Sequence, residues 1–373
     1  MNKTELTQKS ISATFWSGLD TLSRYGVQFF VSVALARLLT PKEFGLIGML
    51  SLFIGIAGLF IDSGFSSALT QKREISQEEK SSVFYFNVVI GLIIAIALAT
   101  TAPLIAAFYE LPILAPLTRI MAVNLVVTSF GSVHWALLNK ELNFRKGMKI
   151  SLIATIVSGS LAITLAWSGW GVWSLAIQSV AYSLTSTAVI WIMYPWRPAI
   201  ALHTRALRSL FGFGSFVLLT GILNTVYTRL NTLIIGKMYS AGDLGLYSRA
   251  YSTQQLPTSL ISAIVNRVAF PIFSTAADDK DLLRRGCRKA VVGIMLINLP
   301  MMAGLVAVAR PLVLTLFGDK WAPCIPYLQI LGLAGLLWPF QIINPSVIAA
   351  QGRSDLLFRL EIMKDAIGLI FLL

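Results

Sequence analysis

Residues 82–108 read SVFYFNVVIGLIIAIALATTAPLIAAF, a run without a single charged side chain. An α-helix needs about 20 mostly apolar residues to cross the hydrocarbon layer of a bilayer, so this run predicts a membrane-spanning helix. Its continuous apolar character predicts a helix rather than a strand of a membrane barrel, in which apolar and polar residues alternate. Comparable runs lie near 15–38, 44–66, 113–138, 150–168, 170–194, 212–236, 244–266, 288–309 and 325–350, and an eleventh begins near 360.

The composition supports an all-α polytopic membrane protein. Hydrophobic residues make up 56% of the chain and charged residues only 13%, with a mean hydropathy of +0.74. A soluble chain has roughly a quarter of its residues charged. The formal net charge of +13 does not indicate nucleic-acid binding, because the basic residues lie in short loops between the apolar runs. Cys287, Cys324, His134 and His203 have no metal-ligand spacing, so we expect no metal and no cofactor.

The loop charges predict the orientation of the chain. Of the 30 Lys and Arg residues, 21 lie at the N-terminus or in every second loop after it. The loops on the other side hold only five, namely Arg37, Lys42, Lys237, Arg310 and Lys320. Because cytoplasmic loops carry the excess of basic residues, the N-terminus is expected in the cytoplasm.

Two segments 200 residues apart share a pattern. Residues 36–46 read ARLLTPKEFGL and residues 236–246 read GKMYSAGDLGL. Both hold a basic residue, then Thr or Ser, then an acid, then Gly-Leu, and both follow an odd-numbered span. We expect Gly45 and Gly245 to begin the return helices, with Glu43 and Asp243 near the positive helix N-terminus.

This repeat predicts two lobes, because transporters are often built from two related halves. The predicted N-lobe is 1–209 with six spans, and the C-lobe is 210–373 with spans 7–11. A matching second lobe would hold a further span, so we expect the sequence to be a fragment of a longer protein. In the tenth span, the pairs Trp338-Pro339 and Asn344-Pro345 predict a broken helix.

Arginines within the spans indicate an anionic ligand. A charge at mid-bilayer costs about 2.5 to 3.5 kcal/mol on insertion scales, so such residues usually face a polar interior. Arg24, Arg229 and Arg249 are the leading candidates, and Arg119 ranks lower because its side chain could equally reach the membrane surface. Phosphate or an acidic sugar is the expected ligand.

Polar residues at helical spacing extend these candidates. Gln28 follows Arg24 on the same face of the first span, and Asp20 precedes it, although Asp20 and Arg24 alone would form a local ion pair. Asp20 and His134 are candidates for ion coupling by residue type. In the eighth span, Tyr247, Tyr251 and Gln254 suit a sugar, because rings stack on sugar faces and amides bond hydroxyls. The alternative is an interfacial tyrosine belt with polar contacts between helices.

Several stretches carry a family resemblance along essentially the whole chain. The sequence resembles the oligosaccharide flippases of the multidrug/oligosaccharidyl-lipid/polysaccharide (MOP) exporter superfamily, in particular their colanic-acid and teichuronic-acid exporter branch. The stretches are LARLLTPKEFGLIGM (35–49), DSGFSSALTQKREIS (62–76), NKELNFRKGMKI (139–150), IIGKMYSAGDLGLYSRAY (234–251), NRVAFPIFSTAADD (266–279) and LFGDKWAPCIPYLQIL (316–331).

The resemblance implies a bacterial inner-membrane protein with two lobes around a cationic cavity. It implies movement of polyprenyl-pyrophosphate-linked oligosaccharides between leaflets by alternating access, alongside polysaccharide polymerase and export machinery. Arg24 matches the position of a cavity arginine in related lipid II flippases, and Arg229 and Arg249 would be its counterparts in the second lobe. These three would hold the pyrophosphate, while Gln28, Tyr247, Tyr251 and Gln254 would face the sugar.

Two rival functions remain in view. A drug antiporter of the MATE type would be expected to have acidic cavity residues, which the arginine excess disfavours. A membrane glycosyltransferase or polymerase would need catalytic groups in large outer loops, whereas the predicted outer turns are short and hold few acids. We therefore expect a transporter and not an enzyme.

Overall fold

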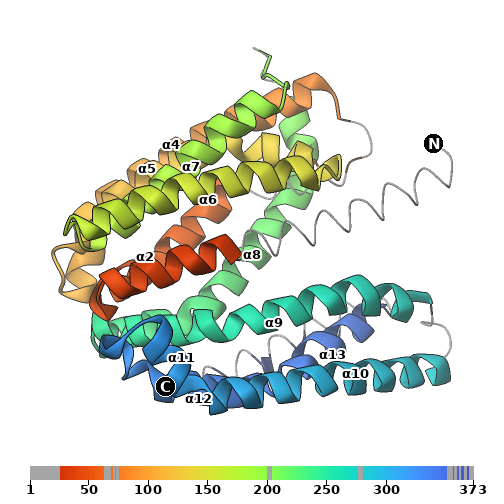
Figure 1. The fold of residues 1–373 in the computed structure, drawn as a ribbon. Coiled ribbons are helices and arrows are strands. Elements are labelled where there is room, and N and C mark those ends of the chain that lie inside the picture. The colour runs from red at the N-terminus through yellow and green to blue at the C-terminus, as the bar shows by residue number, and fades with distance from the viewer. Residues whose placement is uncertain are drawn as a thin grey trace. The chain divides into compact units, whose positions relative to one another are not determined.

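The computed structural model describes residues 26–62, 75–199, 204–275 and 280–350, with positions 69, 72, 356, 359, 360, 363, 364 and 368. All regular structure in these residues is helical, which confirms the predicted fold class (Figure 1). After a helix at Gly26–Leu38, the elements are α2 (Pro41–Asp62), α4 (Gln77–Tyr109), α5 (Leu114–Lys140), α6 (Phe144–Trp167), α7 (Val172–Met193), α8 (Thr204–Met238), α9 (Ala241–Thr275), α10 (Lys280–Ala307), α11 (Ala309–Leu316), the 3₁₀ helix η1 (Asp319–Trp321), α12 (Cys324–Gly335) and α13 (Trp338–Ala350).

Within the described ranges, seven segments are long and apolar enough to cross a membrane. They correspond to predicted spans 2–6, 9 and 10, so the chain is a multi-pass membrane protein. The predicted spans 7 and 8 are also helical, as α8 and α9, with 35 residues each. These two helices are not among the seven, and polar side chains interrupt their apolar character.

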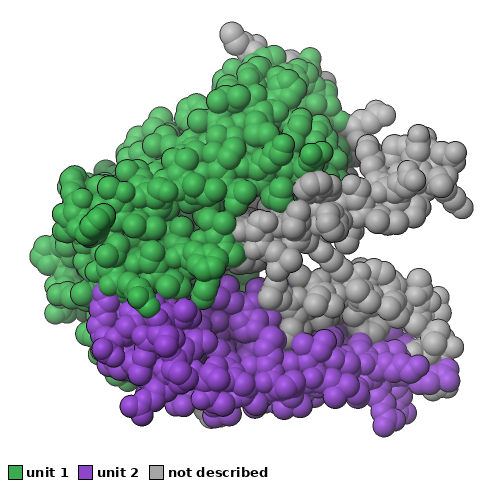
Figure 2. All heavy atoms as spheres, viewed as in Figure 1, with its two compact units in different colours: residues 1–244 green, residues 245–373 purple. Residues whose placement is uncertain are grey.

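The chain divides into two compact units, residues 1–244 and 245–373 (Figure 2). Helix α9 begins in unit 1 and continues into unit 2. The lobe boundary at residue 209 stays a prediction. In unit 1, α4 packs along α5, α5 along α7, and α7 along α6 (Figure 1).

Small residues let the helices of unit 1 approach closely. A Cβ added at Gly91 of α4 would lie 2.8 Å from the Cβ of Ser129 on α5. A Cβ added at Gly159 of α6 would lie only 2.5 Å from the Cγ2 of Val31, so helix Gly26–Leu38 packs closely on α6 at this glycine. Interfaces of small residues are typical of membrane helices, because apolar surface has no aqueous phase to escape from there.

Hydrogen bonds between side chains join the same helices. Asn87 of α4 donates to the Ser132 hydroxyl of α5 at 3.0 Å, and Asn124 of α5 donates to Ser179 of α7 at 3.1 Å. Such bonds are worth about 0.6 kcal/mol on average in a membrane. They therefore specify which faces meet more than they stabilise the bundle.

The 200-residue repeat forms the same local structure twice. Helix α2 begins at Pro41 and α9 at Ala241. The Glu43 carboxylate accepts from the Thr40 backbone at 2.6 Å, and the Asp243 carboxylate accepts from the Ser240 backbone at 3.2 Å. The predicted acid at each helix N-terminus is confirmed. The prediction that the glycines begin the helices is wrong by four residues, because the capping Thr or Ser precedes the acid by three.

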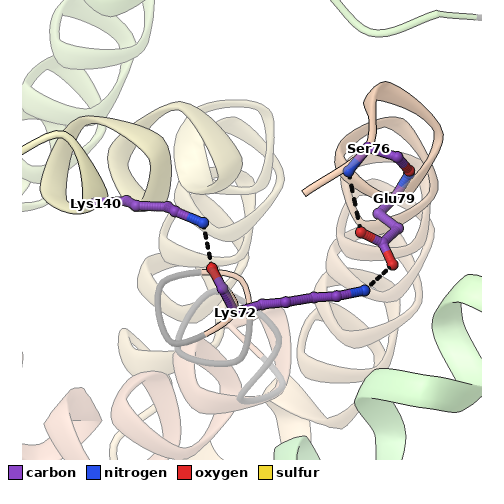
Figure 3. A network of polar contacts seen from close by, with 4 residues as sticks. All are labelled: Lys72, Ser76, Glu79 and Lys140. Atoms are coloured by element: carbon purple, nitrogen blue, oxygen red, sulfur yellow. Dashed lines mark hydrogen bonds and ion pairs between the residues drawn. The ribbon is translucent and has the colours of Figure 1, made fainter. Parts of the chain in front are cut away.

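A reciprocal capping box begins α4, and it joins a polar network (Figure 3). Ser76 and Glu79 cap each other reciprocally, with the Glu79 amide donating to the Ser76 hydroxyl at 3.1 Å. Lys72 pairs with the Glu79 carboxylate, and Lys140 at the end of α5 donates to the Lys72 carbonyl. The network therefore ties the loop before α4 to both α4 and α5.

The predicted break in the tenth span is confirmed in unit 2. Helix α12 ends at Gly335 and α13 begins at Trp338, so the interruption is residues 336–337, and Pro339 is the second residue of α13. Pro339 cannot donate a backbone hydrogen bond, which favours a new helix start there. Pro345, by contrast, lies inside α13 without ending it.

Candidate functional site

A polar face runs along the first half of α9 in unit 2. The rings of Tyr247 and Tyr251, one turn apart, stack with centroids 6.1 Å apart and planes 19° from parallel. Gln255 donates to the Tyr251 hydroxyl at 2.7 Å, and its own oxygen accepts from Thr258 at 2.9 Å. Tyr251 is 42% exposed. The arrangement presents an aromatic surface whose polar groups are held in place by neighbours on the same helix.

Gln254 lies on the adjacent side of α9 and is buried. A Cβ added at Gly335 would lie 2.6 Å from the Gln254 amide nitrogen, so this amide packs on the last residue of α12. The amide therefore contacts the broken helix, whereas Tyr251 is open to the surroundings. The structure brings Tyr247 and Tyr251 together and directs Gln254 elsewhere.

Asn298 of α10 completes the environment of the break, and the sequence reading did not single it out. Its amide nitrogen donates to the carbonyls of Gly335 and Leu336, both at 3.1 Å, and its side chain is fully buried. A broken membrane helix leaves carbonyls without helical donors, and these must be satisfied inside the protein. A lone Asn in the apolar run 288–309 was the available signal.

Arg249 projects from α9 into an aromatic cluster. Its guanidinium carbon lies 5.1 Å from the centroid of the Phe317 ring and 5.2 Å from that of Trp321. The side chain is 6% exposed. Cation–π contact with two rings compensates part of the cost of burying the charge. Arg249 thus attaches α9 to the segment formed by α11 and η1, which the sequence reading treated as a loop.

The remaining predicted binding residues lie in unit 1 or outside the described residues. Gln28 is exposed near the start of helix Gly26–Leu38, and this helix packs through Val31 and Leu35, which lie further along it. Arg229 is exposed on α8. Arg24 and Asp20 lie outside the described residues. The substrate contacts of Gln28, Arg229 and Arg24 and the ion coupling by Asp20 stay predictions.

His134 is fully buried among aromatic rings at the end of α5. Its ring centroid lies 4.8 Å from that of Trp191 and 5.0 Å from that of Trp196. Its Nε2 is 3.3 Å from the Trp196 carbonyl oxygen. These contacts hold the segment that follows α7. A coupling role for His134 stays a prediction.

That segment, residues 194–199, is bonded to the start of α4 as well. Trp196 donates to the Gln77 side chain at 2.8 Å, and the Ala199 amide donates to the Ser81 hydroxyl at 2.9 Å. The connection towards α8 is therefore anchored on unit 1 up to residue 199. Among the described residues, no group of three or more His, Cys, Asp or Glu could hold a metal ion.

Solved structures define the class of this fold. A lipid II flippase, MurJ, in an inward closed conformation superposes with a TM-score of 0.73 at 14% identity, covering 91% of this chain and 76% of that chain. An inward-facing multidrug resistance MATE transporter of the MOP superfamily superposes with a TM-score of 0.69 at 16% identity, covering 90% and 85%. The chain has the MOP transporter fold.

Sequence comparison then identifies the family. Residues 34–326 match the polysaccharide biosynthesis protein family. The teichuronic acid biosynthesis protein TuaB of Bacillus subtilis is 30% identical over 95% of this chain and 74% of its own length. The lipopolysaccharide biosynthesis protein WzxC of Escherichia coli is 29% identical over 96% and 73%. The chain belongs to the polysaccharide biosynthesis protein family, and the resemblance inferred from its motifs is confirmed.

Proposed function

We propose that this protein is a flippase that moves lipid-linked oligosaccharides across the bacterial inner membrane for surface polysaccharide synthesis. Three findings support the proposal: the family membership, the MOP fold shared with a lipid II flippase, and the relatives named for polysaccharide biosynthesis. The proposal includes a polyprenyl pyrophosphate carrier and alternating access of two lobes. It assigns transport rather than the making or breaking of bonds.

The polar face of α9 is the observation that carries the proposal. Stacked Tyr247 and Tyr251 offer ring faces to the apolar face of a sugar, and the Tyr251 hydroxyl is oriented by Gln255. Ring faces and fixed polar groups are the usual partners of hydroxyl-rich ligands. A small cationic drug would instead be expected to meet carboxylates, and the one acid of α9, Asp243, is bonded to the backbone and hydroxyl of Ser240.

The arginines divide into two groups under this proposal. Arg229 is exposed, so its guanidinium can meet a pyrophosphate, and Arg24 is proposed for the same role from its position in the sequence. Arg249 is buried between two rings, so we assign it the attachment of α11 and η1 in this conformation. Gln254 packs on Gly335, so we propose that it contacts the broken helix rather than bonding a hydroxyl of the sugar.

Complementation tests the proposal. A strain that lacks its own flippase of this family would receive the gene that encodes this chain. The amount of surface polymer and the amount of the protein in the membrane would both be measured. Arg24→Ala is expected to abolish export while the protein stays in the membrane. The matched control is Arg119→Ala, because Arg119 is exposed at the start of α5. Normal export by Arg24→Ala, or equal loss in both variants, would contradict the proposed role of Arg24.

A direct assay distinguishes the function from its rivals. Purified protein in vesicles should move a fluorescent polyprenyl-pyrophosphate oligosaccharide between leaflets and should leave a cationic dye on its own side. Transport of the dye alone would favour a drug antiporter. Formation of a longer glycan would favour a polymerase. Cross-linking to the polysaccharide polymerase encoded in the same strain would test the proposed export partners.

A further inference from the structure

An apolar groove of about 630 Å³ lies inside unit 1, between α2, α4 and α8. Thr101 is the one polar residue in its lining, and the Thr101 hydroxyl is occupied by the Ala97 carbonyl at 2.8 Å. The lining therefore offers no hydrogen-bond donor to an occupant. It consists of Phe53, Ile56, Ala57, Phe60, Ile94, Ala97, Leu98, Thr101, Leu104, Ile105, Phe108 and Leu233.

The groove has the length of a lipid chain. Its lining on α4 runs from Ile94 to Phe108, which at 1.5 Å per residue is about 21 Å. One leaflet contributes about 15 Å of hydrocarbon, half the thickness of the core. Leu104, in the lining, is 69% exposed, and an exposed side chain at membrane depth is covered by hydrocarbon. An extended acyl chain thus fits the groove in length and in polarity.

A pair of opposite charges stands at the Phe108 end of the groove. The ammonium nitrogen of Lys237 lies 5.3 Å from the centroid of the Phe108 ring and 2.9 Å from the Glu110 carboxylate. Leu233, in the lining, is one helical turn before Lys237 on α8, which puts both on one side of that helix. The side chains of Lys237 and Glu110 are 40% and 81% exposed, so both can reach a further partner.

The charge state of the pair follows from its contacts. The hydrogen bond from Lys237 holds the pKa of the Glu110 carboxyl below its usual range. Glu110 is therefore a carboxylate at neutral pH, and it stands at the α4 C-terminus with a left-handed backbone that ends the helix. The groove thus ends beside one positive and one negative group.

We propose that this groove binds one acyl chain of a phosphatidylethanolamine molecule of the bilayer, with its phosphate at Lys237 and its ammonium at Glu110. A zwitterionic headgroup matches both charges, whereas the carboxylate repels a purely anionic headgroup. The same repulsion argues against the pyrophosphate of the transported substrate. The bilayer lipid proposed here is therefore a different ligand from the transported substrate.

Native mass spectrometry of the purified chain in detergent tests the proposal. The probes are dioleoyl phosphatidylethanolamine, phosphatidylcholine, phosphatidylglycerol and a polyprenyl phosphate. Phosphatidylethanolamine is expected to bind about three-fold more tightly than phosphatidylglycerol, the size of effect that exposed ion pairs produce. Phosphatidylcholine should bind more weakly than phosphatidylethanolamine, because its quaternary ammonium cannot donate to Glu110.

Two variants separate the chain from the headgroup. Ala97→Phe fills the groove and should remove tight binding of phosphatidylethanolamine, whereas Ile96→Phe, at an exposed neighbour outside the lining, should not. The double variant Lys237→Met/Glu110→Gln should retain chain binding and lose the preference between the two headgroups. The proposal is overturned by tighter binding of phosphatidylglycerol or polyprenyl phosphate, by unchanged binding in Ala97→Phe, or by an unchanged preference in the double variant.

Discussion

The guanidinium carbon of Arg249 lies 5.2 Å from the centroid of the Trp321 ring, with Phe317 against it as well. The side chain of Trp321 is fully buried, whereas Asp319 and Lys320 of the same turn are exposed. One charged residue of α9 therefore holds the segment of α11 and η1. Arg249, which the sequence predicted to bind a ligand, therefore attaches α9 to α11 and η1.

Arg249→Met tests that attachment. The substitution keeps the length of the side chain and removes its charge, so we expect a loss of about 1 kcal/mol of unfolding free energy, as cation–π contacts predict. Arg249→Lys should recover part of it, since an ammonium is a point charge that cannot stack. Unfolding of purified protein in mixed micelles gives the measurement.

A double-mutant cycle with Trp321→Leu provides the control for this prediction. Coupled partners should show a non-additive term, whereas independent sites add within about 0.5 kcal/mol. Additive losses would show that Arg249 and Trp321 do not act together.

Asn298→Leu should destabilise the broken helix. The change leaves the carbonyls of Gly335 and Leu336 without their donor, and an unsatisfied buried group costs about 1 to 3 kcal/mol. The matched control is Asn344→Leu, because Asn344 is exposed on α13. If the two variants unfold at the same temperature, Asn298 does not stabilise the broken helix as assigned.

Tyr251 allows the ring and the hydroxyl to be tested apart. Tyr251→Phe keeps the stacked ring and loses the bond from Gln255, so export should fall by at most about ten-fold, the equivalent of one hydrogen bond. Tyr251→Leu removes the ring and should reduce export further. Polymer export in the complemented strain is the measurement, and Tyr239→Leu, at an exposed tyrosine after α8, is the control. If the Leu variant exports as well as the Phe variant, the ring does not contact the sugar.

The two helix starts of the repeat should respond alike. Thr40→Ala and Ser240→Ala each remove the hydroxyl that bonds the acid of the first turn, and each should cost about 1 kcal/mol. Thr40→Ser should keep nearly all of the stability. Thermal unfolding of the purified variants measures this, and an Ala variant as stable as the parent chain would contradict the equivalence of the two turns.

The stability of unit 1 should fall at alkaline pH through Tyr194. Burial, with the hydrogen bond to the Glu141 carboxylate, raises the pKa of this phenol above its ordinary value of 10.0. The contribution of Tyr194 is therefore fully present below about pH 10, the unfolded value. It is lost as the pH rises towards the folded pKa. Tyr194→Phe should lose less stability than the parent chain between pH 9 and 11, and parallel curves would contradict this.

Much of the fold followed from local patterns. Apolar runs with the length of a bilayer crossing predicted the helices, because a chain in hydrocarbon must satisfy its backbone within each segment. The acids Glu43 and Asp243 near two equivalent helix starts, and the break before Pro339, were predicted for the same kind of reason, although the helices begin four residues before the predicted glycines. Each depends on residues within a few positions of one another.

The contacts of the site followed less from local pattern. Helical spacing predicted that Tyr247 and Tyr251 would share a face, because residues four apart lie one turn apart. It could not predict that Arg249 contacts Phe317 or that Gln254 contacts Gly335, since each pair is distant in sequence. A charged residue in a span is compatible with a ligand, a surface or an aromatic partner, and only the neighbouring helix distinguishes them.

The sequence by itself determined that this chain crosses a membrane many times as helices and belongs among the polysaccharide exporters. Only the tertiary structure decided that Arg249 is enclosed by two rings, that Asn298 satisfies the break after α12, and that a groove beside Lys237 suits a lipid chain. The physical reason is that hydrophobicity and capping act along the chain. Burial, by contrast, depends on which distant residues complete the packing around each side chain.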